Sequence, residues 1–181
     1  MTLWMVRHAQ PLIEKGICYG QLDVPADLEA SQACAQELSL VLPQGINVVT
    51  STLQRCELLA TVLIGLQPGL VIKKDPGLKE MHFGQWEGRA WADIDPAELA
   101  AWTDDFAHYR AGGTGESVTE FMARVAAAVH ELDPAKDTLW VTHAGVIRAA
   151  TLIAQGIRHI SRADQWPVGA PSYGQWCQLT L

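Results

Sequence analysis

Apolar residues along this chain occur in two patterns: short uninterrupted runs, and longer stretches in which they recur every three or four positions. The short runs are rich in branched and aromatic side chains, which is typical of strands buried in a sheet. They predict strands near Leu3, Val48, Val71 and Val141. Because helical stretches separate them, we expect an α/β fold, namely a three-layer α/β/α sandwich with a mostly parallel central sheet.

Four stretches place apolar residues along one face of a helix. Asp27 and Ser117 suit the N-caps of the first and third, and Pro134 follows the end of the third. Residues 173–181 alternate and predict an antiparallel edge strand, whereas residues 96–115 are the least regular region and a candidate lid. The four apolar faces consist of Ala30, Cys34, Leu38 and Val41; Leu53, Cys56, Ala60 and Leu63; Val118, Phe121, Val125, Val129 and Leu132; and Val146, Ala149, Ala150 and Ile153.

Composition indicates one globular domain spanning residues 1–181. Hydrophobic residues make up 49% of the chain and charged residues 18%, which permits a sizeable core. The net charge of −7 has the wrong sign for general nucleic-acid binding. The longest apolar run, residues 58–66, is too short to span a bilayer, and no export signal is evident. We therefore expect a cytoplasmic protein with no nucleic-acid or membrane partner.

The cysteines and histidines do not form a metal-binding pattern. Cys18, Cys34, Cys56 and Cys177 lack the paired short spacing of a zinc site or a disulfide framework. Cys34 and Cys56 fall on apolar helix faces, where cysteine acts as a small core residue. The six histidines contain no His-x-x-x-His pair. We therefore expect neither a metal nor a cofactor.

Two of the predicted strands end in a histidine. The first strand runs into Arg7-His8, and a distant one runs into His143-Ala144. Ligands of open α/β sheets bind at the carboxyl ends of strands, so the two imidazoles are expected to meet there. His143 also precedes a predicted helix, whose N-terminus favours anions. Taken alone, each histidine is explained equally well as the end of a strand.

Three further segments join these two in a recognisable order. The chain carries Arg-His, then Ser-x-Leu-x-Arg, then Glu-x-x-x-Gly-x-Trp-Glu-Gly, then Gly-Glu-Ser, then Thr-His-Ala-Gly. Each motif is weak alone, but the five in this order resemble the histidine phosphatase superfamily, which includes the phosphoglycerate mutases and small phosphomonoesterases. The resemblance implies that His8 is the phosphorylated nucleophile, that Arg7 and Arg55 bind phosphate, that His143 is the second pocket histidine and that Glu80 is the proton donor.

Elementary chemistry agrees with these roles. A phosphoryl group in transfer spreads negative charge over three equatorial oxygens, so catalysis consists mainly of positioning and electrostatics. Arginine suits this task because it is always charged and binds bidentately. Neighbouring cations also disfavour the protonated form of imidazole, which leaves His8 a competent nucleophile. The departing alkoxide needs a proton, which a carboxylic acid can supply.

The identity of the proton donor has an alternative. If the segment around Glu80 is extended, Glu80 and His82 point to the same face, because side chains alternate along a strand. Either group is then able to reach the leaving oxygen, and the motif favours Glu80. Glu87 is expected to be an exposed carboxylate in a turn that ends at Gly88.

Residues 16–23 correspond to a substrate loop. The resemblance implies that Tyr19, Gly20, Gln21 and Ala144 contact substrate together with the arginines and His143. Glycine in such a loop allows backbone amides to approach phosphate closely, although an ordinary glycine turn has the same composition. The Cys-Tyr-Gly-x-x-Asp form resembles that of α-ribazole phosphatases, which dephosphorylate α-ribazole 5′-phosphate or the cobamide phosphate in cobalamin biosynthesis. We therefore expect α-ribazole 5′-phosphate, or the cobamide phosphate, as the substrate of this chain.

Other functions remain open at this point. Glu14 stands where mutases carry an asparagine, and the chain is short for a mutase, so hydrolysis is expected rather than phosphoglycerate mutase activity. A generic or phosphohistidine phosphatase is a further alternative, and a non-catalytic phospho-ligand-binding module is the alternative outside enzymes. Among the seven tryptophans, Trp86, Trp91 and Trp102 are candidates for stacking on a benzimidazole, while most are expected in the core.

Overall fold

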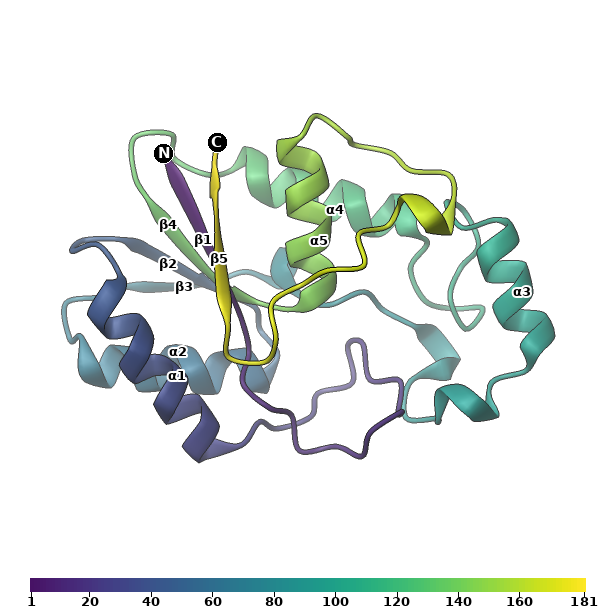
Figure 1. Ribbon diagram of the computed structural model, residues 1–181, viewed down its shortest axis with the longest axis horizontal. Coiled ribbons are helices and arrows are strands. Elements are labelled where there is room, and N and C mark those ends of the chain that lie inside the picture. Colours follow the sequence, from purple (N-terminus) through teal and green to yellow (C-terminus); the bar gives the residue numbers. More distant parts are fainter.

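The computed structural model describes residues 1–181 and is built on a five-stranded sheet with the order β3-β2-β4-β1-β5 (Figure 1). Four neighbouring strands are parallel, and β5 is an antiparallel edge strand beside β1, as predicted. The mostly parallel sheet of the sequence prediction is thereby confirmed. The strands are β1 (Thr2–Arg7), β2 (Asn47–Thr50), β3 (Ile72–Lys74), β4 (Thr138–Thr142) and β5 (Trp176–Thr180).

Helices cover both faces of the sheet, which confirms the three-layer sandwich (Figure 1). Side chains of β1 alternate between two cores, because successive residues of a strand point to opposite faces. Leu3 and Met5 belong to the core under α4 and α5, whereas Trp4 and Val6 belong to the core under α1 and α2. The helices are α1 (Leu28–Val41), α2 (Gln54–Leu66), α3 (Pro96–Asp104), α4 (Val118–His130) and α5 (Ala144–Ala154).

Local capping fixes where these helices begin. The Asp27 carboxylate accepts a hydrogen bond from the Ala30 N–H at 2.7 Å and starts α1. Ser117 and Glu120 form a reciprocal capping box at the start of α4. Both N-caps were expected from the sequence. None of the helices combines the length and the apolar character needed to cross a membrane.

The expectations for residues 96–115 and for the segment of Glu80 need correction. Residues 96–115, predicted to be the least regular region, contain α3, which starts with Asp95 as its N-cap and Pro96 in its first turn. The strand expected near Val71 is confirmed as β3, with the 83% exposed Val71 just before its first residue. The segment of Glu80 is not extended sheet but an irregular stretch after a short 3₁₀ turn, Pro76–Leu78.

Candidate active site

His8 and His143 lie side by side at the carboxyl ends of β1 and β4. These neighbouring parallel strands pair Arg7 with Thr142, so the residue that follows each strand is placed at the same edge of the sheet. The ring centroids are 5.1 Å apart with an angle of 61° between the planes. His8 is 2% exposed and His143 is fully buried. The structure thus brings together two imidazoles that are distant in sequence.

The tautomer of His8 follows from its hydrogen bond. Its Nδ1 lies 2.8 Å from the carbonyl oxygen of Ala9, and because a carbonyl can only accept, Nδ1 carries the proton. Nε2 is then left with a free lone pair, which is the requirement for a nucleophile. Burial, together with the positive charges of Arg55 and Arg7, lowers the pKa of His8 from 6.5 to about 3. His8 is therefore neutral at physiological pH.

Two arginines without carboxylate partners lie beside these histidines. Arg7 ends β1 and donates to the carbonyl oxygen of Pro171, while Arg55, fully buried in the first turn of α2, donates to the carbonyl oxygens of Gly20 and Leu22. Neither makes an ion pair with an acidic side chain. The Nε atoms of both are buried and lack hydrogen-bond partners. Such uncompensated guanidinium groups provide a site for an anion.

His143 is held by residues of the second sequence motif. Its Nε2 lies 2.9 Å from the Ser51 hydroxyl oxygen and 3.5 Å from the Cys56 sulfur. Burial lowers the pKa of His143 well below 6.5, and the charge of Arg55 acts in the same direction. His143 is also the N-cap residue of α5, so it stands at the positive end of that helix. Ser51 is a neighbour of His143 to which the sequence motif alone gave no role.

Glu80 reaches the same helix N-terminus from the other side. One carboxylate oxygen accepts from the Gly145 N–H and the other from the Met81 N–H, each at 3.0 Å. Gly145 lies two residues beyond His143, so Glu80 is tied to the element that carries the second histidine. A Cβ at Gly145 would overlap the Glu80 carboxylate, so any other residue there would force the Glu80 side chain to move.

An ion pair supports the segment that carries Glu80. Arg124 of α4 pairs with Glu116 at 2.8 Å and donates to the carbonyl oxygens of Lys79 and Glu80. Glu116 also accepts from the backbone N–H of His82. The Gly-Glu-Ser motif of the sequence therefore contributes a support for the irregular stretch around Glu80, because backbone groups outside a helix or sheet need such partners.

His82 lies partly at the surface, whereas Glu87 has a different place from the one expected. The His82 side chain is 40% exposed, and its Nε2 is 4.0 Å from Glu87. Glu87, expected to be exposed, is only 11% exposed. It accepts from the backbone N–H groups of Gln21 and Phe83 at 2.8 and 2.9 Å. The expectation was wrong because the Glu87 carboxylate joins two loops that are separate in the sequence.

The residues of the predicted substrate loop pack around Arg55 and Glu80. Gln21 donates from its side-chain amide to the carbonyl oxygen of Glu80 at 3.0 Å, and the Arg55 guanidinium lies 5.3 Å from the centre of the Tyr19 ring. Gly20 has no room for a Cβ, because the Met81 carbonyl oxygen occupies that space. The sequence thus places Tyr19, Gly20 and Gln21 beside the arginine and the acid.

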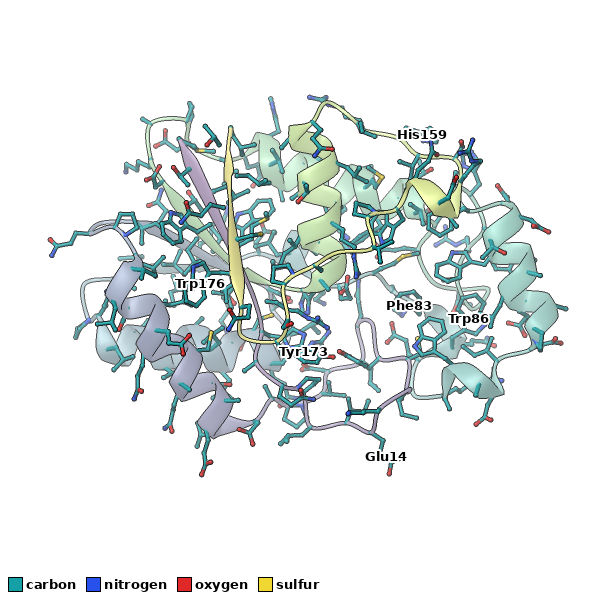
Figure 2. The ribbon with its side chains drawn as sticks, in the orientation of Figure 1. Glu14, Phe83, Trp86, His159, Tyr173 and Trp176 are labelled. Atoms are coloured by element: carbon teal, nitrogen blue, oxygen red, sulfur yellow. The ribbon has the colours of Figure 1, made fainter.

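Asp23 and Ala144 lie next to site residues, whereas Glu14 does not. Asp23 accepts from the backbone N–H of Gln54 at 2.8 Å and so caps α2 in front of Arg55. Ala144 is buried at the first position of α5, next to His143. Glu14 is exposed and points away from the rest of the molecule (Figure 2). Its charge therefore does not act on a ligand between the histidines.

Tyr173 is a member of the site that no sequence motif indicated. Its ring lies 3.8 Å from the Arg7 guanidinium carbon and 5.5 Å from the His8 ring (Figure 2). The stacking is a cation–π contact that holds Arg7 beside His8. Tyr173 precedes β5, so it reaches the histidines only because β5 pairs with β1. A tyrosine in a loop has no local pattern that would reveal this.

A cavity of about 420 Å³ opens beside Glu80 and Gly145. It lies between α3, α5 and the short 3₁₀ turn Ala163–Gln165, and its wall includes Trp102, Phe106 and Trp166. Of the three tryptophans considered for stacking, only Trp102 lines it, since Trp86 is fully buried in the core and Trp91 lies outside the wall. Part of residues 96–115 is thus a wall of the site, and the lid motion stays a prediction.

The geometry defines an anion-binding site with a nucleophile and an acid in an α/β/α protein, and comparison with known proteins assigns the family. The chain matches the histidine phosphatase superfamily (branch 1) over residues 3–179. It therefore belongs to this superfamily, as the motifs predicted. Its similarity to curated phosphatases of the same family identifies it as a phosphatase.

Curated relatives differ in the substrate that their names give. The chain is 34% identical to glucosyl-3-phosphoglycerate phosphatase of Mycolicibacterium vanbaalenii, over 98% of this chain and 83% of the relative. It is 28% identical to adenosylcobalamin/alpha-ribazole phosphatase of Escherichia coli, over 91% of this chain and 86% of the relative. The similarity to α-ribazole phosphatases is thus present but lower.

Solved structures agree with this assignment. The mycobacterial glucosyl-3-phosphoglycerate phosphatase superposes with a TM-score of 0.81 at 29% identity, covering 98% of this chain and 88% of that one. TTHB049 from Thermus thermophilus superposes with a TM-score of 0.74 at 30% identity, covering 99% of this chain and 93% of that one. The α/β/α sandwich is therefore the fold of these relatives.

Proposed function

We propose that this chain hydrolyses phosphomonoesters through a phosphohistidine formed on His8. The observation that carries the proposal is the buried His8, whose Nδ1 is occupied by the Ala9 carbonyl and whose Nε2 is unprotonated, beside two arginines that have no acidic partner. A phosphoryl group bound between His8 and the two arginines contacts two cations and a nucleophile without rearrangement of the pocket.

The first step forms the intermediate. The Nε2 lone pair of His8 attacks phosphorus, and the bond to the ester oxygen breaks. The departing oxygen takes a proton from Glu80, which hydrogen-bonds to Gly145 on the helix that His143 caps. Arg7, Arg55 and neutral His143 bind the phosphoryl oxygens, so these side chains supply the stabilisation and we propose no metal or cofactor.

The second step regenerates the enzyme. The Glu80 carboxylate takes a proton from water, and the water oxygen attacks phosphorus as the bond to His8 breaks. The products are inorganic phosphate and His8 with its free Nε2. Glu80 is protonated again, ready for the next ester. Water must therefore reach the phosphoenzyme, which distinguishes this hydrolysis from a mutase that excludes water.

The nucleophile is tested by trapping. Turnover of p-nitrophenyl phosphate by wild type, His8→Ala and the control His159→Ala is compared, since His159 is exposed and distant in the fold (Figure 2). Rapid quench into alkali, which preserves phosphohistidine, should trap label on His8 in wild type only. Substantial turnover by a folded His8→Ala protein would remove His8 from the role, and binding of phosphate without turnover in wild type would indicate a non-catalytic module.

Two substrates are supported by separate observations. The Cys18-Tyr19-Gly20 loop and the 28% identical relative support α-ribazole 5′-phosphate, and with it a place in cobalamin biosynthesis. The 34% identical relative supports glucosyl-3-phosphoglycerate. Glu14 does not help to choose, because it points to solvent. The test measures kcat/KM and phosphate release for both esters and for 3-phosphoglycerate. Interconversion of phosphoglycerates with little phosphate released would overturn hydrolysis.

A further inference from the structure

Glu80 and Arg148 lie along one side of α5 and line the same cavity. The Gly145 N–H holds the Glu80 carboxylate, and Arg148 follows Gly145 by three positions, so it lies about one turn further on the same helix face. Under the proposed mechanism the leaving oxygen sits at Glu80. Whatever is attached to that oxygen must therefore extend into the cavity, toward Arg148.

No carboxylate of the protein forms a salt bridge with Arg148, although the negative charge of Glu80 acts on it through the cavity that both residues line. Arg148 is half-buried. One terminal nitrogen donates to the Val168 carbonyl oxygen at 3.1 Å, and the buried Nε has no partner. Burial lowers the pKa of Arg148; the Glu80 carboxylate opposes this shift and the charge of Arg7 adds to it. By contrast, half-buried Arg124 has Glu116 as its counterion.

The remainder of the cavity is suited to a flat, bulky group. Trp102 and Phe106 come from α3 and the turn after it, and Trp166 follows the 3₁₀ turn on the opposite side. Aromatic walls of this kind pack against rings, and a volume of about 420 Å³ accepts a body of ring size. The cavity thus combines one unpaired cation with an aromatic wall.

We infer that this cavity binds the leaving alcohol of the substrate, and that this alcohol bears a carboxylate that Arg148 binds and a ring-sized body that the aromatic wall contacts. The inference rests on the proposed function, because it takes Glu80 as the group beside the leaving oxygen. It favours phosphate esters of acidic alcohols over esters of neutral ones such as α-ribazole. Arg7 and Arg55 are then reserved for the phosphate, and Arg148 recognises the second anionic group.

The test uses three synthetic probes: benzyl phosphate, 3-carboxybenzyl phosphate and 4-carboxybenzyl phosphate. Their alcohols leave with similar ease, so the ratio of kcat/KM between a carboxylated ester and benzyl phosphate reports recognition of the carboxylate. Wild type should prefer the better carboxylated ester by about tenfold, which corresponds to about 1.4 kcal/mol. Arg148→Met should bring the ratio to about one, and Arg148→Lys should retain part of the preference.

The control is Arg158→Met, because Arg158 borders a different cavity with His130 and Leu132. Its ratio should equal that of wild type. A wild-type ratio of one or less would overturn the inference whether or not Arg148→Met folds, and so would an unchanged ratio in folded Arg148→Met. Failure of the proposed function has a different signature, namely no hydrolysis of any probe or of p-nitrophenyl phosphate.

Discussion

The hydroxyl groups of Tyr19 and Tyr173 lie 2.8 Å apart and join the substrate loop to the segment before β5. Each ring also faces one of the two arginines: Tyr173 lies 3.8 Å from the Arg7 guanidinium carbon and Tyr19 lies 5.3 Å from that of Arg55. The pair therefore links both guanidinium groups across the site. It restricts two long side chains whose free motion would otherwise oppose phosphate binding.

Removing this hydroxyl contact should weaken phosphate binding. Tyr173→Phe keeps the ring over Arg7 and loses one hydrogen bond, so we expect kcat/KM to fall by about twofold to tenfold, mainly through KM. Tyr173→Leu also loses the cation–π contact and should be several-fold worse. Tyr109→Phe is the matched control, since Tyr109 stacks on buried Trp86 and touches neither arginine. Equal KM values in all four proteins would exclude a positioning role for the pair.

Glu80 should matter most for esters whose alcohol leaves with difficulty. In Glu80→Gln the departing alkoxide of benzyl phosphate has no proton donor, so we expect a loss of about 10² to 10⁴ in kcat/KM. p-Nitrophenolate leaves without protonation, and its ester should lose far less. His82→Gln, the competing assignment, should change neither ester much, because His82 is 40% exposed and absent from the cavity wall. If His82→Gln lost activity toward benzyl phosphate and Glu80→Gln did not, His82 would be the proton donor.

The depressed pKa of His8 predicts how stability depends on pH. Folded His8 stays neutral down to about pH 3, whereas in the unfolded chain it takes up a proton below about pH 6.5. The free energy of unfolding should therefore fall as the pH is lowered from about 6.5 toward 3, by up to about 1.4 kcal/mol per pH unit from this residue. Urea unfolding at several pH values in phosphate-free buffer measures this.

The variant His8→Gln isolates that contribution. Other titrating groups are common to both proteins, so the slope of stability against pH between about 5.5 and 4.5 should be shallower in the variant by about 1 kcal/mol per unit. His159→Gln, which alters an exposed histidine, should keep the wild-type slope. Parallel slopes for wild type and His8→Gln would mean that His8 titrates in the folded protein as it does in the unfolded chain.

The sequence was sufficient to place His8 beside His143, because both follow buried strands and parallel strands end at one edge of a sheet. The capping signals at Asp27 and Ser117 were sufficient for the starts of two helices, since caps are local. α3 was missed because none of its residues is fully buried, so it has no clear apolar face, although Asp95-Pro96 was a usable start signal.

Contacts between loops that are distant in the chain could not be predicted from the sequence. Glu87 was expected in solvent because its own turn is polar, yet its burial depends on Gln21 and Phe83. Tyr173 and Arg148 likewise belong to the site through the packing of β5 and α5, which no motif encodes. Residue type and spacing identify the catalytic groups that lie within a local motif. Substrate specificity depends instead on residues that are brought together only by tertiary packing.

Gly145 offers the most direct test of how the fold holds the acid. A Cβ at this position would overlap the Glu80 carboxylate, so Gly145→Ala must displace Glu80 from the start of α5. We expect kcat/KM for benzyl phosphate to fall at least tenfold, with a smaller loss for p-nitrophenyl phosphate, whose leaving group does not need the proton. The control is Gly65→Ala on α2, where no atom lies within 4 Å of the new Cβ. Alanine in that helix should raise the free energy of unfolding by about 0.5–1 kcal/mol and leave both activities unchanged. Wild-type activity toward benzyl phosphate in folded Gly145→Ala would show that Glu80 can act without its bond to α5.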